Sequence, residues 1–581
     1  MERYSKQNLQ SHNFSVTDGE EVVDLQSEGL AKCVSSGRDN KQERKPVSEH
    51  KMSNIERSSC LNDEKSPKYM THSKDFTLQE NSEAKFHAEV DCLLIQGPQE
   101  ISKATATLAG GRDAVVKRKP RCNELPSFSC DGNHWKMELL DVEEAKKQVL
   151  FSLPTTLTNV MFYFITLVSV MFAGHLGQLQ LAAANLAMSW ASATGLAVVI
   201  GLSGALEALC GQAFGAREYG MLGKYLQASC LISLLASLLI SLLWFFSEPV
   251  LISLLHQDAE ASKLSVVFMK LFIPGLVAFG ILQNVLRFLQ TQSAVVVPFI
   301  FSFISLGLHI GLTYYLVHFT PLGFRGVPLA ASISLCLSLL MFAVYILRSK
   351  KFESTWEGFS LASFSHVPTV LRLGLPGAAV ECLEDWTFEV LVFMAGAFPH
   401  PTQSTSLLGI CVNVELIGYM VSYGLSAAVS TRVSNELGAG NPEKAKSAMT
   451  VALKLSGFLA FLLGLALAIG HNFWAGLFGR TPEIVKAFAS MTPLVAVSVI
   501  LEPLQGVVLG VATGCGWQKL VCYVNLATYL VGMAISGLLG LTTELHAKGL
   551  WIGLMFGISC QTSIILVTVL LKNWAPRSDT A

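Results

Sequence analysis

Long apolar segments, separated by short polar stretches, occupy the chain from residue 149 onward. Twelve of these segments reach or approach the roughly 20 residues that an α-helix needs to cross the hydrocarbon core of a bilayer. They are 149–173, 181–209, 226–246, 266–289, 294–317, 327–347, 370–398, 407–429, 451–470, 487–512, 520–541 and 549–571. The pattern predicts an all-α membrane protein with twelve transmembrane helices.

The second six apolar segments repeat the first six at a shift of about 223 residues. At this shift Gly215 matches Gly438, and Gly326 matches Gly549. Duplicated halves are typical of secondary transporters, which bind their substrate between the halves. Because each half has an even number of spans, both halves enter the membrane from the same side. We therefore predict two pseudo-symmetric six-helix lobes, related by an axis along the membrane normal.

Charged residues are concentrated before the first apolar segment. Residues 1–147 hold 22 of the 42 Lys and Arg residues and 25 of the 43 Asp and Glu residues. So polar a segment buries too little apolar surface to offset the entropy cost of folding. We divide the chain into a disordered cytoplasmic tail (1–133), an amphipathic lead-in at the membrane surface (134–147), an N-lobe (148–347), an inter-lobe linker (348–367), a C-lobe (368–571) and a cytoplasmic C-terminus (572–581).

The basic residues of the loops predict the orientation of the chain. If the tail is cytoplasmic, the loops and terminus on that side hold thirteen Lys and Arg residues, and the opposite loops hold five. Basic residues are enriched in cytoplasmic loops, so we expect both termini in the cytoplasm. The expected location is the vacuolar or the plasma membrane, and the sequence does not distinguish between them.

Acidic residues within the spans are distributed unevenly between the halves. The first half has only Glu207, near a span end. The second half has six, and these are Glu381, Glu384, Asp385, Glu389, Glu415 and Glu502. Acids at membrane depth are costly and usually functional. In general, a carboxyl group in an apolar cavity has a raised pKa, so it can exchange a proton near neutral pH and also attract a cation. Competition of proton and substrate for one carboxylate is the physical basis of antiport.

The spacing of these acids leaves their orientation open. Glu381, Asp385 and Glu389 form one stripe along a helix, while Glu384 is about 100° around the helix from Asp385. All four can face one cavity if the helix kinks, and Pro376 makes a kink feasible. Some of the acids could instead pair structurally with neighbouring polar groups.

Neutral polar and aromatic residues are the remaining candidates for substrate binding. Asn185 and Asn413 lie at roughly equivalent positions of the two halves. Each can hydrogen-bond a substrate or bridge two helices. Trp386 and Tyr419 can stack on a planar ligand, although packing in the core is the more ordinary role for any one aromatic residue. We include Asn185, Trp386, Asn413, Glu381, Asp385, Glu415 and Tyr419 as candidate substrate-binding residues.

Several sequence motifs resemble a known family. They are VSVMFAGHLG (168–177), LSGALEALCGQAFGA (202–216), CLEDWTFE (382–389), STRVSNELGAGNP (430–442), GCGWQK (514–519) and AKGLWIG (547–553). Their order and spread are similar to those of the multidrug and toxic compound extrusion (MATE) family, closest to its plant-type, DETOXIFICATION-like branch. The resemblance implies twelve helices in two six-helix lobes, a central cleft, and efflux of organic solutes in exchange for H⁺ or Na⁺.

The resemblance also implies which acids bind the coupling proton. The family motif at 382–389 places two key acids at Glu384 and Glu389, and the acid of span ten falls at Glu502. Glu381 and Asp385 depart from the family pattern, as does Thr513, which stands where arginine is usual. Prokaryotic relatives have a proton-binding Asp near the position of Ser169. Its absence here implies that coupling is located in the C-lobe.

We therefore predict a secondary active efflux transporter that exchanges protons for organic solutes. No enzyme activity, metal or cofactor is expected, and H⁺ is the coupling ion. The glycine-rich loops lack the GK[ST] ending of a phosphate-binding loop, so ATP is not the direct energy source. The expected partners are small organic solutes and membrane lipids, with no nucleic acid, and the protein is expected to be a monomer. The alternatives are a flippase for a lipid-linked precursor within the same superfold, and a non-transporting membrane receptor or scaffold.

Overall fold

The computed structural model describes residues 141–478 and 482–574. The predicted tail and the first half of the predicted lead-in, residues 134–140, lie outside the described residues. The described ranges form α-helices joined by short turns and short 3₁₀ or π-helical segments, without a β-strand. The predicted all-α class is confirmed.

The N-lobe comprises the helices between Val142 and Arg348. They are α3 (Val142–Leu176), α4 (Gln178–Ala191), η1 (Ser192–Leu196), α5 (Ala197–Ser203), α6 (Ala205–Gly215), α7 (Tyr219–Phe245), η2 (Val250–Leu254), α8 (Ala259–Thr291), α9 (Val296–His318), η3 (Gly323–Arg325) and α10 (Gly326–Arg348). The segments α4, η1, α5 and α6 form one span of 38 residues. The segment η1 is a π-helical turn in the middle of that span.

The C-lobe follows a linker that contains two short 3₁₀ turns, η4 (Lys350–Phe352) and η5 (Leu361–His366). Its helices are α11 (Val367–Ala395), α12 (Pro401–Gly438), α13 (Pro442–Phe478), α14 (Pro482–Gly514), α15 (Gln518–Thr542) and α16 (Ala547–Leu571). In the described part of the chain, 11 helical segments are long and apolar enough to cross a membrane. The remaining predicted span is α11, which has 29 residues and carries the four clustered acids that lower its hydropathy.

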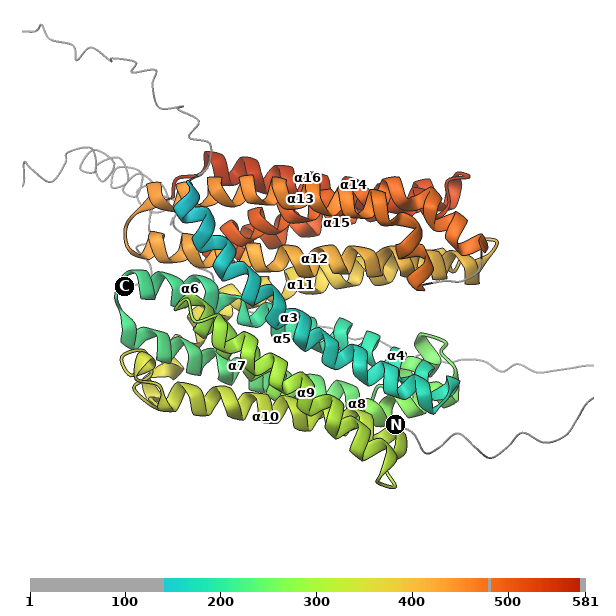
Figure 1. Ribbon diagram of the computed structural model, residues 1–581, viewed down its shortest axis with the longest axis horizontal. Helices are drawn as coiled ribbons and strands as arrows, with labels where there is room; N and C mark the ends of the chain where they lie inside the picture. Colours follow the sequence, from blue (N-terminus) through green and yellow to red (C-terminus); the bar gives the residue numbers. More distant parts are fainter. Residues whose placement is uncertain (1–140, 479–481, 575–581) are drawn as a thin grey trace, which may run out of the picture. The chain divides into compact units, whose positions relative to one another are not determined.

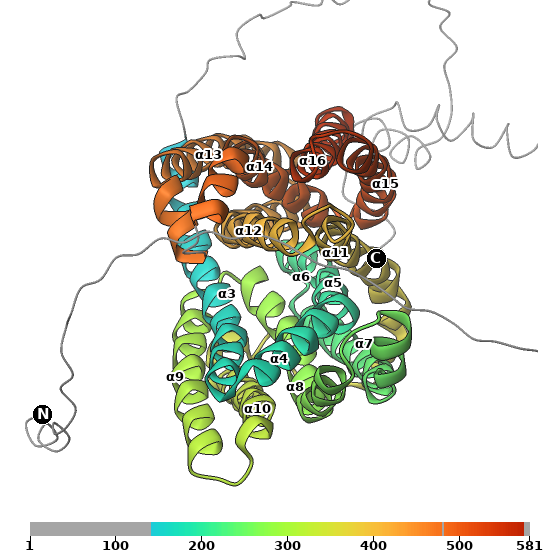
Figure 2. The same ribbon diagram turned by 90° about the vertical axis from the view of Figure 1, so that its right-hand side faces the viewer.

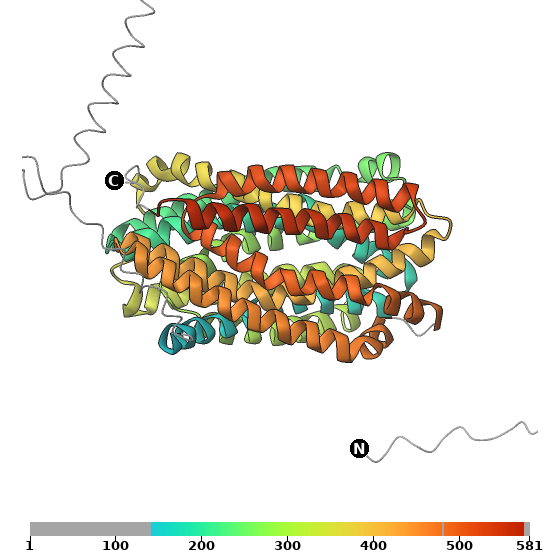
Figure 3. The same ribbon diagram turned by 90° about the horizontal axis from the view of Figure 1, so that it is seen from above.

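Each lobe has large buried hydrophobic side chains, and the N-lobe cluster also takes in Val370, Leu373 and Ala378 of α11. In the N-lobe, Trp244, Phe288 and Phe342 are fully buried, and in the C-lobe Trp551 and Phe488 are fully buried. Figure 1 shows α11–α16 on one side and α4–α10 on the other, with α3 crossing from one group toward the other. The end view in Figure 2 shows the same two groups, and the view in Figure 3 shows the long helices running side by side.

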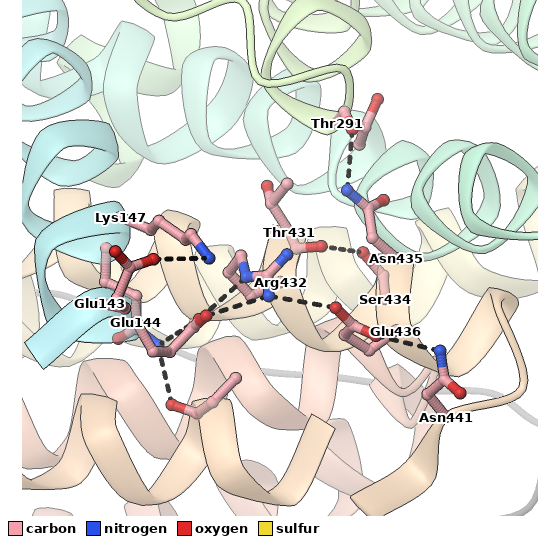
Figure 4. A network of polar contacts seen from close by, with 12 residues as sticks. Glu143, Glu144, Lys147, Thr291, Thr431, Arg432, Ser434, Asn435, Glu436 and Asn441 are labelled. Atoms are coloured by element: carbon pink, nitrogen blue, oxygen red, sulfur yellow. Dashed lines mark hydrogen bonds and ion pairs between the residues drawn. The ribbon is translucent and has the colours of Figure 1, made fainter. Parts of the chain in front are cut away.

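The lead-in does not form a separate surface helix where the structure describes it. Residues 142–147 are the first turns of α3, which continues into the first span as one helix of 35 residues. The Asp141 side chain caps this helix by accepting a hydrogen bond from the Glu144 backbone N–H at 3.1 Å. Glu144 is buried, and Arg432 of α12 donates to both of its carboxylate oxygens, at 2.9 and 3.0 Å (Figure 4). This bidentate pair is the physical reason that the first turns of α3 lie against the C-lobe.

The lobes contact one another closely at the end where α6 and α12 terminate. A Cβ atom added to Gly215 would lie 2.0 Å from the backbone oxygen of Asn435, and one added to Gly438 would lie 2.0 Å from that of Gln212. Any side chain at either position would force the helices apart. These repeat-related glycines therefore allow the backbones of the two lobes to touch.

Two hydrogen bonds at this end are related by the internal repeat. The Gln212 Nε2 atom of α6 donates to the Gly514 carbonyl oxygen at 3.1 Å. The Asn435 Nδ2 atom of α12 donates to the Thr291 carbonyl oxygen at 3.2 Å, as Figure 4 shows. Gly514 and Thr291 are the last residues of α14 and α8, the fourth spans of their lobes. Each lobe thus donates a hydrogen bond to the last residue of the fourth span of the other lobe.

Candidate functional site

A cavity of about 430 Å³ lies between the lobes. Its N-lobe wall is formed by residues of α3, α4, η1, α5, α8 and α10, and its C-lobe wall by residues of α11, α12, α14, α15 and α16. This is the position that the duplicated sequence predicts for a substrate site.

The C-lobe wall carries the acidic residues. All six acids that the sequence places in the spans of the second half line the cavity, and they are Glu381, Glu384, Asp385, Glu389, Glu415 and Glu502. Both the stripe at 381, 385 and 389 and the offset Glu384 reach it, so the question left open by the helical spacing is answered in favour of one shared cavity. Tyr419 also lines the cavity.

The N-lobe wall is largely aromatic and apolar. Phe268, Phe272 and Phe279 project from α8, and Phe162 projects from α3. The three α8 residues recur at spacings of four and seven, which places them on one face of the helix. A ligand in this cavity would lie between an acidic wall and an aromatic wall.

Two acids of α11 are hydrogen-bonded to the opposite lobe. Ser192 in η1 donates its hydroxyl to Asp385 Oδ2 at 2.9 Å, and Ser189 in α4 donates to Glu389 Oε1 at 2.7 Å. A π-helical turn rotates the residues that follow it relative to a regular α-helix, and such turns are frequent at functional sites. Here the turn begins at Ser192, where the N-lobe meets the acids of α11.

The other acids of the cavity differ in their surroundings. Glu384 accepts a hydrogen bond from Asn525 Nδ2 at 3.3 Å. Glu415 is almost fully buried and accepts from Ser498 Oγ at 2.7 Å, while its Oε1 atom has no hydrogen-bond partner among the described residues. Glu502 is buried as well and lines the cavity from α14.

Three predicted substrate-binding residues do not line the cavity. Asn185 lies on the exposed side of α4. Asn413 is exposed and donates to the Gly409 carbonyl oxygen of its own helix at 2.7 Å. Trp386 is 48% exposed, and its Nε1 atom donates to the Ala193 carbonyl oxygen at 2.8 Å. Trp386 therefore bridges the lobes beside the cavity.

Several residues that line the cavity were missed by the sequence interpretation. They are the polar or hydroxyl-bearing residues Asn159, Tyr163, Gln283, Gln505 and Tyr529 and the aromatic residues Phe162, Phe268, Phe272 and Phe279. Two glutamines within apolar spans are a signal that could have been used. The phenylalanines could not have been identified, since an aromatic residue that faces a cavity and one that faces the core look alike in a sequence.

Ser169 lies near the position at which prokaryotic relatives have a proton-binding Asp. It lines the same cavity. Its hydroxyl lies 3.1 Å from Nε2 of His309, which is fully buried in α9. Ser334 lies 3.3 Å from the Nδ1 atom of the same ring. The N-lobe therefore places a neutral hydroxyl at this position, with a histidine behind it.

A second, smaller cavity has a volume of about 110 Å³ and is lined by several of the same residues. We call it the narrow cavity. Glu381, Glu384 and Glu502 line both cavities. The narrow cavity is also lined by Glu207 and Arg287, which form a buried ion pair with an N–O distance of 2.5 Å. From these acids it extends toward the end of the bundle where the lobes are in contact. Within the described residues, no group of three or more His, Cys, Asp or Glu residues is arranged to hold a metal ion.

The sequence of this chain matches a family model and known plant proteins. The MatE family model matches residues 154–315 and 376–538. Protein DETOXIFICATION 18 of Arabidopsis thaliana is 53% identical over 438 residues, which cover 75% of this chain and 93% of that protein. Protein DETOXIFICATION 17 of the same plant is 40% identical over 445 residues, which cover 76% of this chain and 92% of that protein.

Solved structures show the same fold. The crystal structure of the eukaryotic MATE transporter AtDTX14 aligns with a TM-score of 0.72 and 35% identity, covering 74% of this chain and 97% of that one. An outward-facing multidrug resistance MATE family transporter aligns with a TM-score of 0.66 at 18% identity and so supports the fold alone. The predicted two-lobe architecture and the resemblance to the MATE family are confirmed. The chain is a multi-pass integral membrane protein of the MATE family of transporters.

Proposed function

We propose that this protein is a proton-coupled efflux transporter for amphipathic organic molecules that are cationic or neutral. The observation that carries the proposal is the contrast between the two walls of the 430 Å³ cavity. Six carboxyl groups lie on the C-lobe wall, and phenylalanine rings lie on the N-lobe wall. A planar ring bearing an amine matches both, because the rings can stack on it while a carboxylate attracts its charge.

The coupling follows from competition at the acids. When Glu384, Glu389 or Glu502 is ionised, it attracts a cationic substrate. When the same carboxylate gains a proton, it loses that charge and the attraction, so the substrate is released. Proton and substrate therefore occupy the site at different stages of an alternating-access cycle.

The charge of the cavity argues against polyanionic substrates. Neither Lys nor Arg is among the described residues that line the larger cavity. Arg287 lines the narrow cavity, but its charge is balanced by Glu207 at 2.5 Å. A carboxylate-rich solute such as citrate would be repelled by the acids of the cavity. No unpaired basic side chain among the described lining residues would attract it. The same argument disfavours a flippase for a lipid-linked anionic precursor, which needs a strongly cationic cavity.

The topology that we propose places both termini in the cytoplasm. The contacts of Gln212 and Asn435 then lie at the cytoplasmic side, so the lobes are closed there. Either the vacuolar or the plasma membrane is compatible with this arrangement. We further propose that the protein acts as a monomer surrounded by membrane lipids, uses H⁺ as its coupling ion without a cofactor, binds no nucleic acid and catalyses no chemical reaction.

Purified protein reconstituted into vesicles tests the proposal. An imposed pH gradient should drive movement of the planar cation ethidium, and collapse of the gradient with a protonophore should stop it. The rival reading as a receptor or scaffold predicts no gradient-driven movement of any solute. Failure of a wide panel of cationic and neutral aromatic solutes to move would contradict the proposal, provided that the protein is correctly folded in the vesicles.

A further inference from the structure

The narrow cavity has a wall rich in polar groups that are not satisfied by the protein. Arg287, Gln505 and Gln518 line it, and each is more than nine-tenths buried. The Arg287 Nε, Gln505 Oε1 and Gln518 Oε1 atoms have no hydrogen-bond partner among the residues that the structure describes. A buried polar group that has no hydrogen-bond partner destabilises the folded protein, because it has lost its bonds to water without replacement. Three such groups around one cavity indicate that a polar ligand satisfies them.

The dimensions of the cavity limit what this ligand can be. Its volume of about 110 Å³ is about a quarter of the 430 Å³ of the main cavity. A cavity needs about 10–15 Å³ of such volume to hold one water molecule, so the narrow cavity has room for a small group of water molecules. One donor and two acceptors on the wall can each bind water, which both donates and accepts. The ligand that fits both the chemistry and the size is a small cluster of water molecules.

The position of the cavity connects the acids to one end of the bundle. Glu381, Glu384 and Glu502 lie where it meets the main cavity. At the other extreme it is lined by Thr513 and Gln518, next to Gly514, the last residue of α14. Gln518 is the first residue of α15. The narrow cavity therefore runs from the acids to the helix ends at the side where the lobes are closed.

A hydrogen-bonded chain fixes the orientation of one wall residue. Gln505 Nε2 donates to Gln561 Oε1 at 3.2 Å, and Gln561 Nε2 donates to Asn525 Oδ1 at 2.8 Å. Asn525 in turn donates to Glu384 at 3.3 Å. Because its amide nitrogen is used in this chain, Gln505 presents its oxygen as the group left to bind water.

The charges around the narrow cavity are compatible with proton movement. The titratable and charged residues that line it are Glu207, Arg287, Glu381, Glu384, Tyr419, Tyr423 and Glu502. The guanidinium of Arg287 is neutralised by Glu207 and also lies over the Tyr423 ring, with its Cζ atom 5.3 Å from the ring centroid. No uncompensated positive charge among the described lining residues therefore repels a proton that approaches the acids.

We propose that the narrow cavity holds a chain of water molecules that carries the coupling proton between Glu384 and Glu502 and the closed end of the bundle, apart from the route of the substrate. A water at the Thr513 end takes up a proton, and each water passes one on to the next. The last water gives a proton to a carboxylate oxygen: an O–H bond of that water breaks as an O–H bond forms on the carboxyl group, which loses its negative charge. The reverse sequence releases the proton. This inference rests on the proposed proton coupling.

The substitution Gly506→Val tests the path by filling the narrow cavity. Gly506 lines it, and a Cβ atom there would lie 3.8 Å from the Cβ atoms of Ser422 and Ser426, an ordinary contact. Its matched control is Gly457→Val in α13, where an added Cβ meets nothing within 4 Å. Ethidium transport driven by a pH gradient and exchange of labelled for unlabelled ethidium at equal pH are measured in vesicles. Exchange needs the lobes to move but needs no net proton transfer.

The expected result for Gly506→Val is loss of gradient-driven transport with retention of self-exchange, and the control should keep both. Retention of both activities would overturn the proposal, and so would loss of both, since that would mean that the valine blocks movement of the lobes. Absence of gradient-driven transport by the wild-type protein would count instead against the proposed function. A density map that resolves ordered solvent decides the inference independently. Water within hydrogen-bond distance of Gln505 and Gln518 supports it, and a dry cavity overturns it.

Discussion

Ser430 donates a hydrogen bond of 2.5 Å from its Oγ atom to Glu207 Oε2, although the two residues are 223 positions apart in the chain. That separation equals the shift of the internal repeat, so the two residues occupy equivalent places in the two lobes. Equivalent residues can contact one another only close to the axis that relates the lobes. The pair therefore marks that axis. It also shows that the duplicated lobes diverged there, since one carries an acid and the other a hydroxyl.

The reciprocal hydrogen bonds around this axis should control closure of the lobes. We expect Gln212→Ala and Asn435→Ala each to destabilise the closed end by about 1 kcal/mol, the net value of an ordinary hydrogen bond. The two effects should be similar in size, because each mutation removes the repeat equivalent of the other. Distances between spin labels on the ends of α6 and α12 measure the shift.

The control for this prediction is Asn413→Ala, which removes an amide that bonds only to a carbonyl of its own helix where the structure describes it. It should leave the label distances unchanged. Strongly unequal effects of Gln212→Ala and Asn435→Ala would contradict the symmetric role that we assign to the two amides.

Glu384 should be essential for coupling. Glu384→Gln keeps the shape of the side chain and can still accept the hydrogen bond from Asn525, but it cannot titrate. We expect proton-driven exchange to be abolished while folding and membrane insertion are retained. The measurement is ethidium transport in vesicles over a range of pH, with thermal unfolding of the purified protein as the check on folding.

The matched control for Glu384→Gln is Glu443→Gln in the first turn of α13. The Glu443 side chain is 83% exposed and pairs with Lys446 at the surface, where an ion pair contributes at most about 1 kcal/mol. It should transport like the wild type. Near-normal transport by Glu384→Gln at every pH would remove Glu384 from the coupling mechanism.

Deletion of residues 1–133 should preserve transport. The polar composition of this segment predicts disorder, and every contact of the cavities described above comes from residues after 140. The turnover of the truncated protein in vesicles should match that of the full chain. A truncated protein that is correctly inserted but inactive would show that the tail takes part in the mechanism.

Organic cations should compete better than polyanions for transport. The acids on the C-lobe wall make the cavity potential negative whenever they are ionised, and the larger cavity has no described basic residue in its lining. Ethidium uptake should fall when another aromatic amine is added and should be insensitive to citrate. If citrate outcompeted organic cations, our assignment of the substrate class would be wrong.

The sequence by itself determined the all-α fold, the number of spans and the division into two lobes. These follow from hydrophobic segment length and internal repetition, which are local or periodic properties of a chain. It also identified the six acids of the second half, because acids at membrane depth stand out against apolar surroundings. The outcome for α11 illustrates the limit: helical spacing placed Glu384 about 100° around the helix from Asp385, and only the structure shows that one cavity reaches both.

The tertiary structure decided which neutral residues belong to the site. Asn185 and Asn413 were predicted from their polarity, yet both lie on exposed faces, while Gln505 and Phe272 line the cavity. The direction in which a neutral side chain points depends on how its helix is rotated against its neighbours. That rotation is set by packing between residues distant in sequence, such as the meeting of Gly215 with Asn435. No periodicity within a single span contains this information.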